Sequence, residues 1–280
     1  MNSSIRKLDC AGRTLTLDRP RIMGIVNVTP DSFSDGGKWL GKTDAIQHAL
    51  AMQEAGADII DVGGESTRPG AQAVSLQQEL DRVIPVVEAI VPQLSVPVSI
   101  DTSKPEVMRA AVGAGAGLIN DVFALTQAGA VQAAAELAVP VCLMHMQGEP
   151  RVMQHNPVYE DVAGEVTAYL LERARVCESG GVLKQNIILD PGFGFGKTLQ
   201  QNIALFHALP DLVASGFPVL VGISRKAMIG HLTGREMPER VPGSIIAAVL
   251  AVQNGASIVR VHDVAETCDA LKVATALWQT

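Results

Sequence analysis

The sequence predicts an α/β fold, a (β/α)8 TIM barrel with an N-terminal β-hairpin closing the bottom. Eight apolar runs of strand length recur along the chain, and alanine-rich stretches with helical spacing lie between them. Continuous apolar strands that alternate with helices are typical of a parallel sheet buried on both faces. The length agrees, because such barrels use about 250 residues and the chain has 280 without a visible linker. We therefore expect one domain over residues 1–280.

Each predicted strand ends in, or is followed at once by, a polar residue able to do chemistry. The runs are Ile22–Asn27, Ala57–Asp61, Val96–Asp101, Leu118–Asp121, Pro140–His145, Ile187–Asp190, Val219–Arg225 and Ile258–His262. In this fold the active site forms where the C-terminal ends of the strands emerge. The side chains expected at one shared mouth are therefore Asn27, Asp61, Asp101, Asn120, His145, Asp190, Lys226, Arg260 and His262.

The remaining elements follow from residue spacing and from residues that begin helices. Residues 8–18 alternate in polarity, which predicts a hairpin that plugs the open bottom of a barrel over 22–278. Helices are expected at Ala45–Ala55, at Leu76–Val91 after Ser75, near Pro105, at Ser244–Asn254 and at Val264–Trp278. The loops Val28–Lys42, Gly63–Val74 and Met146–Glu160 are long, as lids over a site would be.

Composition argues against several classes of function. Hydrophobic residues make up 48% and aromatic residues only 4%, so the core should be aliphatic. The net charge of −7 argues against a general nucleic-acid binder. We also expect no membrane partner, because the N-terminus lacks a signal peptide and no apolar run reaches spanning length. Four cysteines are scattered without metal-ligand spacing, and a reducing cytoplasm is the simplest location.

Two of the long loops carry groups that suit phosphate or a metal. The loop from Asn27 to Gly37 is dense in Thr, Ser and Asp and can bind a metal or a phosphate ester. A solvated turn is the alternative, but the lone aromatic Phe33 favours a loop that covers something. In the next loop, Thr67 and Arg68 offer a hydroxyl and a guanidinium suited to phosphate oxygens. Alone, that loop would be an ordinary glycine-rich turn.

The segment Asp190–Thr198 nearly spells a nucleotide-binding P-loop. We reject that function, because Pro191 stands where the motif requires its first glycine. What remains is a strand-end carboxylate followed by a flexible loop. A carboxylate can accept two parallel N–H bonds from the edge of an amidine-like heterocycle. Phe193 and Phe195 would then cover its flat ring.

The cations near the C-terminal strands predict an anion site. Ser224-Arg225-Lys226-Ala227 opens a helix, so backbone N–H groups and cations lie together there. Arg260 and His262 alternate along the eighth strand and should both point inward. A single strand-end arginine is about as often part of a structural ion pair. Several cations at one mouth favour an anionic ligand, since these loops are the usual phosphate grip of such barrels.

The ends of the third, fourth and fifth strands predict a polar floor. Asp101 and Asn120 could each cap the turn that follows, but together with Asp190 they offer several acceptors. Met144 is expected to pack, either in the core or against a ligand ring. Asp61 is interpreted as a residue that orients the loop carrying Arg68.

Taken in order, these segments resemble the dihydropteroate synthase family of folate biosynthesis. The resemblance covers Ile22 to Val273 and rests on NVTPDSFSDGG, DVGGESTRPGA, IDTSKPEV, IND, LMHMQG, LDPGFGFGK, GISRK and RVHDV. The combination is highly specific, although no single motif is. It implies a transferase that joins 7,8-dihydropterin-6-ylmethyl diphosphate to p-aminobenzoate, making 7,8-dihydropteroate and releasing diphosphate.

The resemblance also implies a role for each site residue. The pterin would bind Asp101, Asn120, Met144, Asp190 and Lys226. The diphosphate would bind Asn27, Thr67, Arg68, Arg260 and His262, and Asn27 would also hold Mg²⁺, the implied cofactor. The p-aminobenzoate would bind Phe33, Arg68, Pro69, Phe195 and Ser224. The catalytic residues would be Asp101, Asp190, Lys226, Asp31 and Asp35.

Elementary chemistry agrees with this reaction. Mg²⁺ and cations that neutralise the diphosphate make it a good leaving group. A pterin carbocation would then suit the nearby carboxylates, and an uncharged aniline nitrogen could attack it without a strong base. Expected partners are the two small-molecule substrates and, by resemblance, a second copy in a homodimer.

Two other functions remain open on the sequence. A pterin-dependent methyltransferase would share the floor but would not need a diphosphate grip. A non-catalytic pterin-binding relative should have lost charged residues at the mouth.

Overall fold

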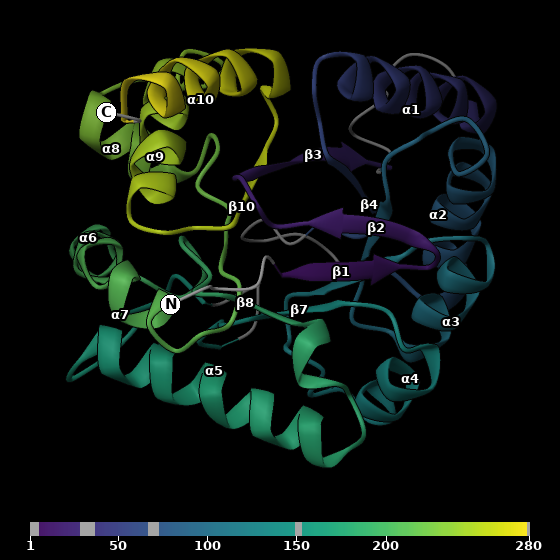
Figure 1. Ribbon diagram of the computed structural model, residues 1–280, viewed down its shortest axis with the longest axis horizontal. Coiled ribbons are helices and arrows are strands. Elements are labelled where there is room, and N and C mark those ends of the chain that lie inside the picture. The colour runs from purple at the N-terminus through teal and green to yellow at the C-terminus, as the bar shows by residue number, and fades with distance from the viewer. Residues whose placement is uncertain (1–5, 29–36, 67–72, 149–152, 279–280) are drawn as a thin grey trace.

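The computed structural model describes residues 6–28, 37–66, 73–148 and 153–278. Within them one parallel sheet curls into a barrel that helices surround (Figure 1). Its strands are β3 (Arg21–Asn27), β4 (Ile59–Gly63), β5 (Val98–Asp101), β6 (Leu118–Asp121), β7 (Val141–Met144), β8 (Ile187–Asp190), β9 (Leu220–Val221) and β10 (Ile258–Val261). They pair in the order β8-β7-β6-β5-β4-β3-β10-β9, and a parallel bridge between Leu189 and Val219 closes the ring. The predicted (β/α)8 barrel is confirmed.

Helices cover the outer wall of the barrel. They are α1 (Gly37–Glu54), α2 (Leu76–Ile90), α3 (Pro105–Gly113), α4 (Ala130–Leu137), α5 (Val162–Ser179), α6 (Leu199–His207), α7 (Leu209–Val213), α8 (Ala227–Thr233), α9 (Val241–Gln253) and α10 (Val264–Trp278), with a 3₁₀ turn at Lys184–Asn186. The predicted start signals are confirmed: Ser75 forms a capping box with Gln78, and Pro105 opens α3. The first long loop is shorter than predicted, because α1 already begins at Gly37.

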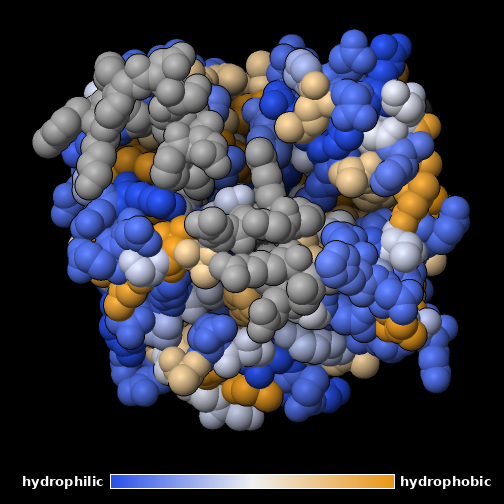
Figure 2. Space-filling view, turned by 180° about the vertical axis from the view of Figure 1, so that it is seen from behind, coloured by the Kyte–Doolittle hydropathy of each residue, from blue (hydrophilic) through white to orange (hydrophobic). Residues whose placement is uncertain are grey.

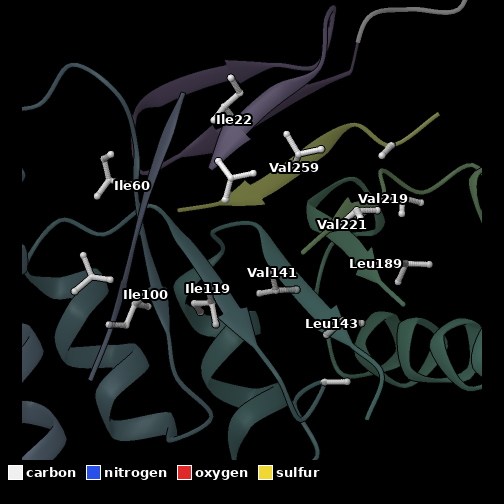
Figure 3. Packing of buried hydrophobic residues seen from close by; sticks show 14 of the residues in the cluster. Ile22, Ile60, Ile100, Ile119, Val141, Leu143, Leu189, Val219, Val221 and Val259 are labelled. Atoms are coloured by element: carbon white, nitrogen blue, oxygen red, sulfur yellow. The ribbon is translucent and has the colours of Figure 1, made fainter. Parts of the chain in front are cut away.

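Side chains on the outer side of the strands form the main core with the helices. Because side chains alternate along a strand, each strand gives one set outward and one set inward. Figure 3 shows members of the outward set: Ile22, Ile60, Ile100, Ile119, Val141, Leu143, Leu189, Val219, Val221 and Val259. All ten are Ile, Val or Leu, so this layer is aliphatic as the composition predicted.

The N-terminal hairpin closes the bottom of the barrel. β1 (Lys7–Cys10) and β2 (Arg13–Thr16) pair antiparallel and lie across one barrel end (Figure 1). Leu8, Cys10 and Leu15 pack against the lowest inward residues of the wall: Met23, Ile59, Leu118, Cys142, Ile188, Leu220 and Ile258. A Cβ at Gly117 would stand 2.4 Å from the Cys10 carbonyl oxygen, so the close fit of the hairpin requires this glycine. The predicted plug is confirmed.

One strand is much shorter than predicted. β9 holds only Leu220 and Val221, whereas the sequence predicted a run to Arg225. Arg225 has a φ of 58°, in the left-handed region, which is incompatible with a strand. The other strands end within two residues of the predicted positions. Across the described ranges, no helix has both the length and the apolar character that a membrane span requires.

Candidate active site

The mouth of the barrel collects the polar ends of the strands. Two positions beyond the plug layer, the next inward residues are Asp61 on β4, Asn120 on β6, Asp190 on β8 and Arg260 on β10. Asp101 ends β5, where it is in register with Asn120. The alternation that buries apolar side chains at the bottom thus delivers polar ones at the top. On the face opposite the hairpin, the described residues are mostly hydrophilic at the surface (Figure 2).

An ion-pair network spans the mouth. Arg260 donates from Nε to Asp61 at 2.7 Å and from Nη2 to Asp101 at 2.8 Å. Asn120 donates from Nδ2 to the same Asp61 oxygen at 3.1 Å. Asp61 is fully buried, and its other oxygen, Oδ1, has no hydrogen-bond partner among the described residues. One guanidinium therefore ties β4, β5 and β10 together, and Asn120 adds β6.

Burial sets the ionisation of this network. Loss of solvent raises the pKa of Asp101 to about 7, with Arg260 opposing the rise and nearby carboxylates such as Asp61 adding to it. For Arg260, burial disfavours the charge, but Asp61 and Asp101 outweigh it and raise its pKa. The guanidinium is therefore a fixed charge, whereas burial works against the ionised form of Asp101 and the pairing with Arg260 favours it.

A second polar cluster lies where β8 and β9 meet. Asp190 accepts a 2.7 Å hydrogen bond on Oδ1 from the Gly192 N–H. Lys226 donates to the Phe193 carbonyl, and its Nζ lies 4.2 Å from the centroid of the Phe195 ring. Burial raises the pKa of Asp190 and lowers that of Lys226 to about 8. A carboxylate, an ammonium group and an aromatic face thus lie side by side, a set that suits a flat heterocycle with both donors and acceptors.

Ser224 and His262 lie together at the ends of neighbouring strands. The Ser224 Oγ is 3.0 Å from His262 Nδ1 and accepts from the His262 N–H at 3.2 Å. Arg225 contributes less to the predicted anion site, because its Nε donates to Asp263 at 3.0 Å and its Nη2 pairs with the same carboxylate. Of the two adjacent cations, Lys226 is the one that interacts electrostatically with Asp190 and lies over the Phe195 ring.

Other predicted site residues have simpler positions. Asn27 ends β3 half-buried and in register with Gly63 of β4. Met144 is buried and in register with Asp190. Six predicted site residues lie outside the described residues, and their roles stay predictions: Asp31, Phe33, Asp35, Thr67, Arg68 and Pro69.

The described donor set bears on the predicted metal. Within the described ranges, no group of three or more His, Cys, Asp or Glu side chains is arranged to hold a metal ion. Mg²⁺ usually keeps few protein ligands and takes the rest from waters and substrate phosphates. The amide oxygen of Asn27 is a hard ligand of the kind that Mg²⁺ accepts.

Two residues lie elsewhere than the sequence predicted: His145, expected at the mouth, and Phe193, expected over a ligand ring. His145 packs edge-on against Tyr169 of α5, with ring centroids 5.0 Å apart, because strand alternation turns it outward. Phe193 is fully buried and packs against Phe206 with ring centroids 5.9 Å apart. Of the two loop aromatics, only Phe195 is partly exposed, and its ring is the one that lies against the Lys226 ammonium.

Sequence reasoning underestimated two residues. Asp61 was interpreted as an orienting residue for a loop, but it is the centre of the Arg260 network. Its inward register, two positions after Ile59, was the signal that could have identified it. Lys197 is buried with its Nζ 2.9 Å from the Gly192 carbonyl oxygen. It was noted only as part of the rejected P-loop match, and no local pattern marks it.

Known proteins resemble this chain over nearly its whole length. Residues 23–262 match the family described as pterin binding enzyme. The dihydropteroate synthase of Escherichia coli (strain K12) is 53% identical over 270 residues, 96% of each chain. The structure of Xanthomonas albilineans dihydropteroate synthase with 4-aminobenzoic acid has a TM-score of 0.95 at 57% identity, covering 99% of this chain and 100% of that one. The Xanthomonas albilineans enzyme in complex with 7,8-dihydropteroate gives a TM-score of 0.90 at 54% identity, covering 98% and 99%.

Proposed function

The chain belongs to the dihydropteroate synthases of the pterin-binding enzyme family, and we propose how its barrel mouth divides the work of their reaction. It is a transferase that condenses 7,8-dihydropterin-6-ylmethyl diphosphate with p-aminobenzoate, giving 7,8-dihydropteroate and diphosphate. The observation that carries the proposal is the convergence of two polar clusters on one barrel end, one around Arg260 and one around Asp190 and Lys226.

The pterin binds on the floor of the mouth. The residues that hold it are Asp101, Asn120, Met144, Asp190 and Lys226. A carboxylate has acceptor capacity for several bonds, so Asp190 can keep the Gly192 N–H and still accept from the N–H groups of the ring edge. The Lys226 ammonium donates to an acceptor of the ring, and the buried Met144 thioether packs against its face.

The leaving group departs towards the cations. The C–O bond breaks, and its electron pair leaves with the diphosphate. Arg260 meets this charge already oriented, since Asp61 and Asp101 use two of its five N–H donors and leave others for phosphate oxygens. Preorganised charge of this kind lowers the barrier because nothing has to reorient during the reaction. His262, with Thr67 and Arg68 of the second loop, completes the grip.

Mg²⁺ is the proposed cofactor. Asn27 would hold it at the mouth together with the diphosphate. When bound, the ion neutralises charge on the leaving group.

The p-aminobenzoate binds beside the floor. Phe195 and Ser224 contact it there, together with Phe33, Arg68 and Pro69. The lone pair of its aniline nitrogen forms the new C–N bond with the pterin methylene carbon, and the displaced proton passes to solvent or diphosphate. The carboxylates of Asp101 and Asp190 stabilise the carbocation before the attack. Asp31 and Asp35 of the first loop are the remaining proposed catalytic residues, and the loops exclude water that would otherwise capture the cation.

The test is to incubate the purified protein with the pterin diphosphate, p-aminobenzoate and Mg²⁺. Diphosphate release that requires p-aminobenzoate, with dihydropteroate formed in equal amount, is the expected result. A methyltransferase would instead bind a folate and release no diphosphate. A non-catalytic relative would bind the pterin without turnover.

We propose that the active form is a homodimer that pairs through α9 and α10. These helices, which lie side by side in Figure 1, carry five exposed apolar side chains: Ile246, Leu250, Val273, Leu277 and Trp278. Apolar patches of this kind mark interaction surfaces. Light scattering after size-exclusion chromatography should give twice the mass of the 29.5 kDa chain, and Leu277→Glu should give the monomer mass. An unchanged mass in the variant would place the contact elsewhere.

The cytoplasm is the proposed location, with the two small molecules as ligands and neither nucleic acid nor membrane as a partner. All four cysteines are free thiols, which agrees with a reducing compartment. Fractionation of cells that express the protein at its natural level tests the location.

A further inference from the structure

The loop between β8 and α6 is held by side chains at every carbonyl from Gly192 to Gly196. The donors come from several parts of the chain: Lys197 to Gly192 and Phe195, Lys226 to Phe193, Gln154 to Gly194 and Tyr159 to Gly196. Asn202 of α6 adds a bond on the inner side, where its Oδ1 accepts from the Gly194 N–H at 2.7 Å. A segment that the sequence predicted to be flexible is therefore fixed from several directions.

Lys197 is the inner anchor of this loop. Its Nζ lies 2.9 Å from the Gly192 carbonyl oxygen, 3.0 Å from that of Phe195 and 3.0 Å from His145 Nδ1. An ammonium group has three donors, and each of them has a partner here. Burial lowers the pKa of His145 to about 3, so its ring is neutral at physiological pH and Nδ1 acts as the acceptor.

Lys197 places an amine in a buried position where its hydrogen-bond partners are uncharged. The side chain is 2% exposed, and its three hydrogen-bond partners are two carbonyls and a neutral imidazole. Burial lowers the pKa of this lysine to about 7, with Lys226 adding to the effect and Asp190 opposing it. A buried ammonium group with neutral partners costs folding free energy, but an apolar side chain here would remove the donor that two carbonyls and an imidazole nitrogen share. The groups that the ammonium holds in place therefore indicate what Lys197 does.

The group that depends most on this anchor is Phe195. Asp190 is the last residue of β8 and is positioned by the sheet, in register with Met144. Phe195 is five residues further along, outside any strand or helix, and its own carbonyl is bound by Lys197. Loss of the anchor should therefore displace Phe195 far more than Asp190.

We propose that Lys197 is a positioning residue for the p-aminobenzoate half of the site, acting through the backbone of Phe195 and not on the substrate itself. This inference rests on the proposed role of Phe195 in p-aminobenzoate binding. The Phe195 ring lies over Lys226, which belongs to the proposed pterin floor. Lys197, which holds the Phe195 backbone, and Lys226, which contacts its ring, therefore together set the spacing between the two substrate sites.

The test is steady-state kinetics of Lys197→Met with each substrate varied in turn. The KM for p-aminobenzoate should rise about tenfold, while the KM for the pterin diphosphate and kcat stay within about threefold. Lys197→Gln keeps two N–H donors and should recover part of the loss. It also replaces Lys197→Met if that variant does not fold.

Arg173→Met is the matched control. Arg173 also holds two backbone carbonyls, those of Ala124 and Leu125 at 2.9 and 3.0 Å, but in the segment after β6. It should lower thermal stability without separating the two KM values. If Lys197→Met behaves in the same way, the lysine is only structural and the inference is wrong.

A double-mutant cycle with Phe195→Ala separates this inference from the proposed function. Phe195→Ala alone should raise the KM for p-aminobenzoate, and adding Lys197→Met should then raise it no further, because both changes act through one ring. Full additivity would overturn the inference and leave the role of Phe195 intact. No effect of Phe195→Ala would contradict the proposed role of Phe195, and this inference with it.

Discussion

The two ends of the barrel are built from the same strands and have opposite chemistry. At the bottom, Ile59 of β4 and Ile258 of β10 pack under the hairpin. Two residues later the same strands present Asp61 and Arg260 to each other in a buried ion pair. One step of strand alternation therefore separates the end that stabilises the fold from the end that does chemistry. The bottom buries apolar surface, whereas the mouth buries charge and keeps it paired.

Substitutions at the two ends should therefore change different measured properties. Bottom substitutions should change the free energy of unfolding and leave the kinetic constants alone, and mouth substitutions should do the reverse. The exception is a mouth residue whose charge is needed by buried neighbours.

Arg260→Ala should have the largest effect, because it should lower both the free energy of unfolding and the activity. Removal of one partner from a buried ion pair leaves Asp61 and Asp101 uncompensated, and we expect a loss of about 3 to 5 kcal/mol in the free energy of unfolding. Activity should also fall, with diphosphate binding affected more than p-aminobenzoate binding. Urea unfolding and calorimetric titration with each ligand measure the two effects. The control is Arg175→Ala, which removes an exposed ion pair with Glu172 and should stay within about 0.5 kcal/mol.

Leu8→Ala should lower the free energy of unfolding without changing the kinetic constants. The side chain is fully buried between hairpin and barrel, so truncation should cost about 3 kcal/mol of stability. Both KM values should match those of the unaltered protein. Leu183→Ala, at a side chain that is 55% exposed, is the control and should be nearly neutral. A change in either KM for Leu8→Ala would mean that the two ends are coupled.

Asp190→Asn should weaken ligand binding with little change in the free energy of unfolding. It turns one acceptor into a donor that faces ligand N–H groups, so pterin affinity should fall roughly 50-fold. Stability should change less, because burial already disfavours the charge that is removed. Fluorescence titration with a pterin and thermal unfolding check both statements. Unchanged affinity would remove Asp190 from the floor.

Ser75→Ala should have the smallest effect and belongs to neither end. It removes the capping box of α2, in which the Ser75 Oγ accepts from the Gln78 N–H, at a cost of about 1 kcal/mol. Activity should be unaffected although Ser75 follows the second long loop. The same change at Thr198, which caps α6 directly after Lys197, should match the stability loss. A rise in the KM for p-aminobenzoate only in Thr198→Ala would extend the positioning role to this cap.

The sequence was sufficient to predict the barrel, its plug and most of the polar residues that meet at the mouth, because those features repeat locally. Strand positions follow from apolar runs, and a residue at a strand end reaches the mouth whatever the details of packing. Asp101, Asn120, Asp190, Lys226 and Arg260 were predicted in this way.

What the sequence could not show depends on contacts between distant segments. Nothing local indicates that Arg260 is bound by Asp61 and Asp101, since the partners are 199 and 159 residues away. His145 was placed at the mouth because only strand ends were counted, without the direction that alternation imposes. Lys197 lies in a loop whose path depends on glycines with positive φ, so its burial has no sequence pattern.

The bridge between Leu189 and Val219 has a consequence for how the enzyme holds its substrate. This contact between β8 and β9 consists of a single bridge, with a 2.9 Å hydrogen bond from the Leu189 N–H to the Pro218 carbonyl. It has the fewest paired residues of any two neighbouring strands in the barrel wall. Asp190 stands on one side of it, and the stretch that leads to Lys226 stands on the other. Local opening of the barrel should therefore occur first between β8 and β9, and amide hydrogen exchange should be fastest along this edge. A pterin that bound both residues, as proposed, would also stabilise this contact, and its release would be coupled to local opening between the two strands.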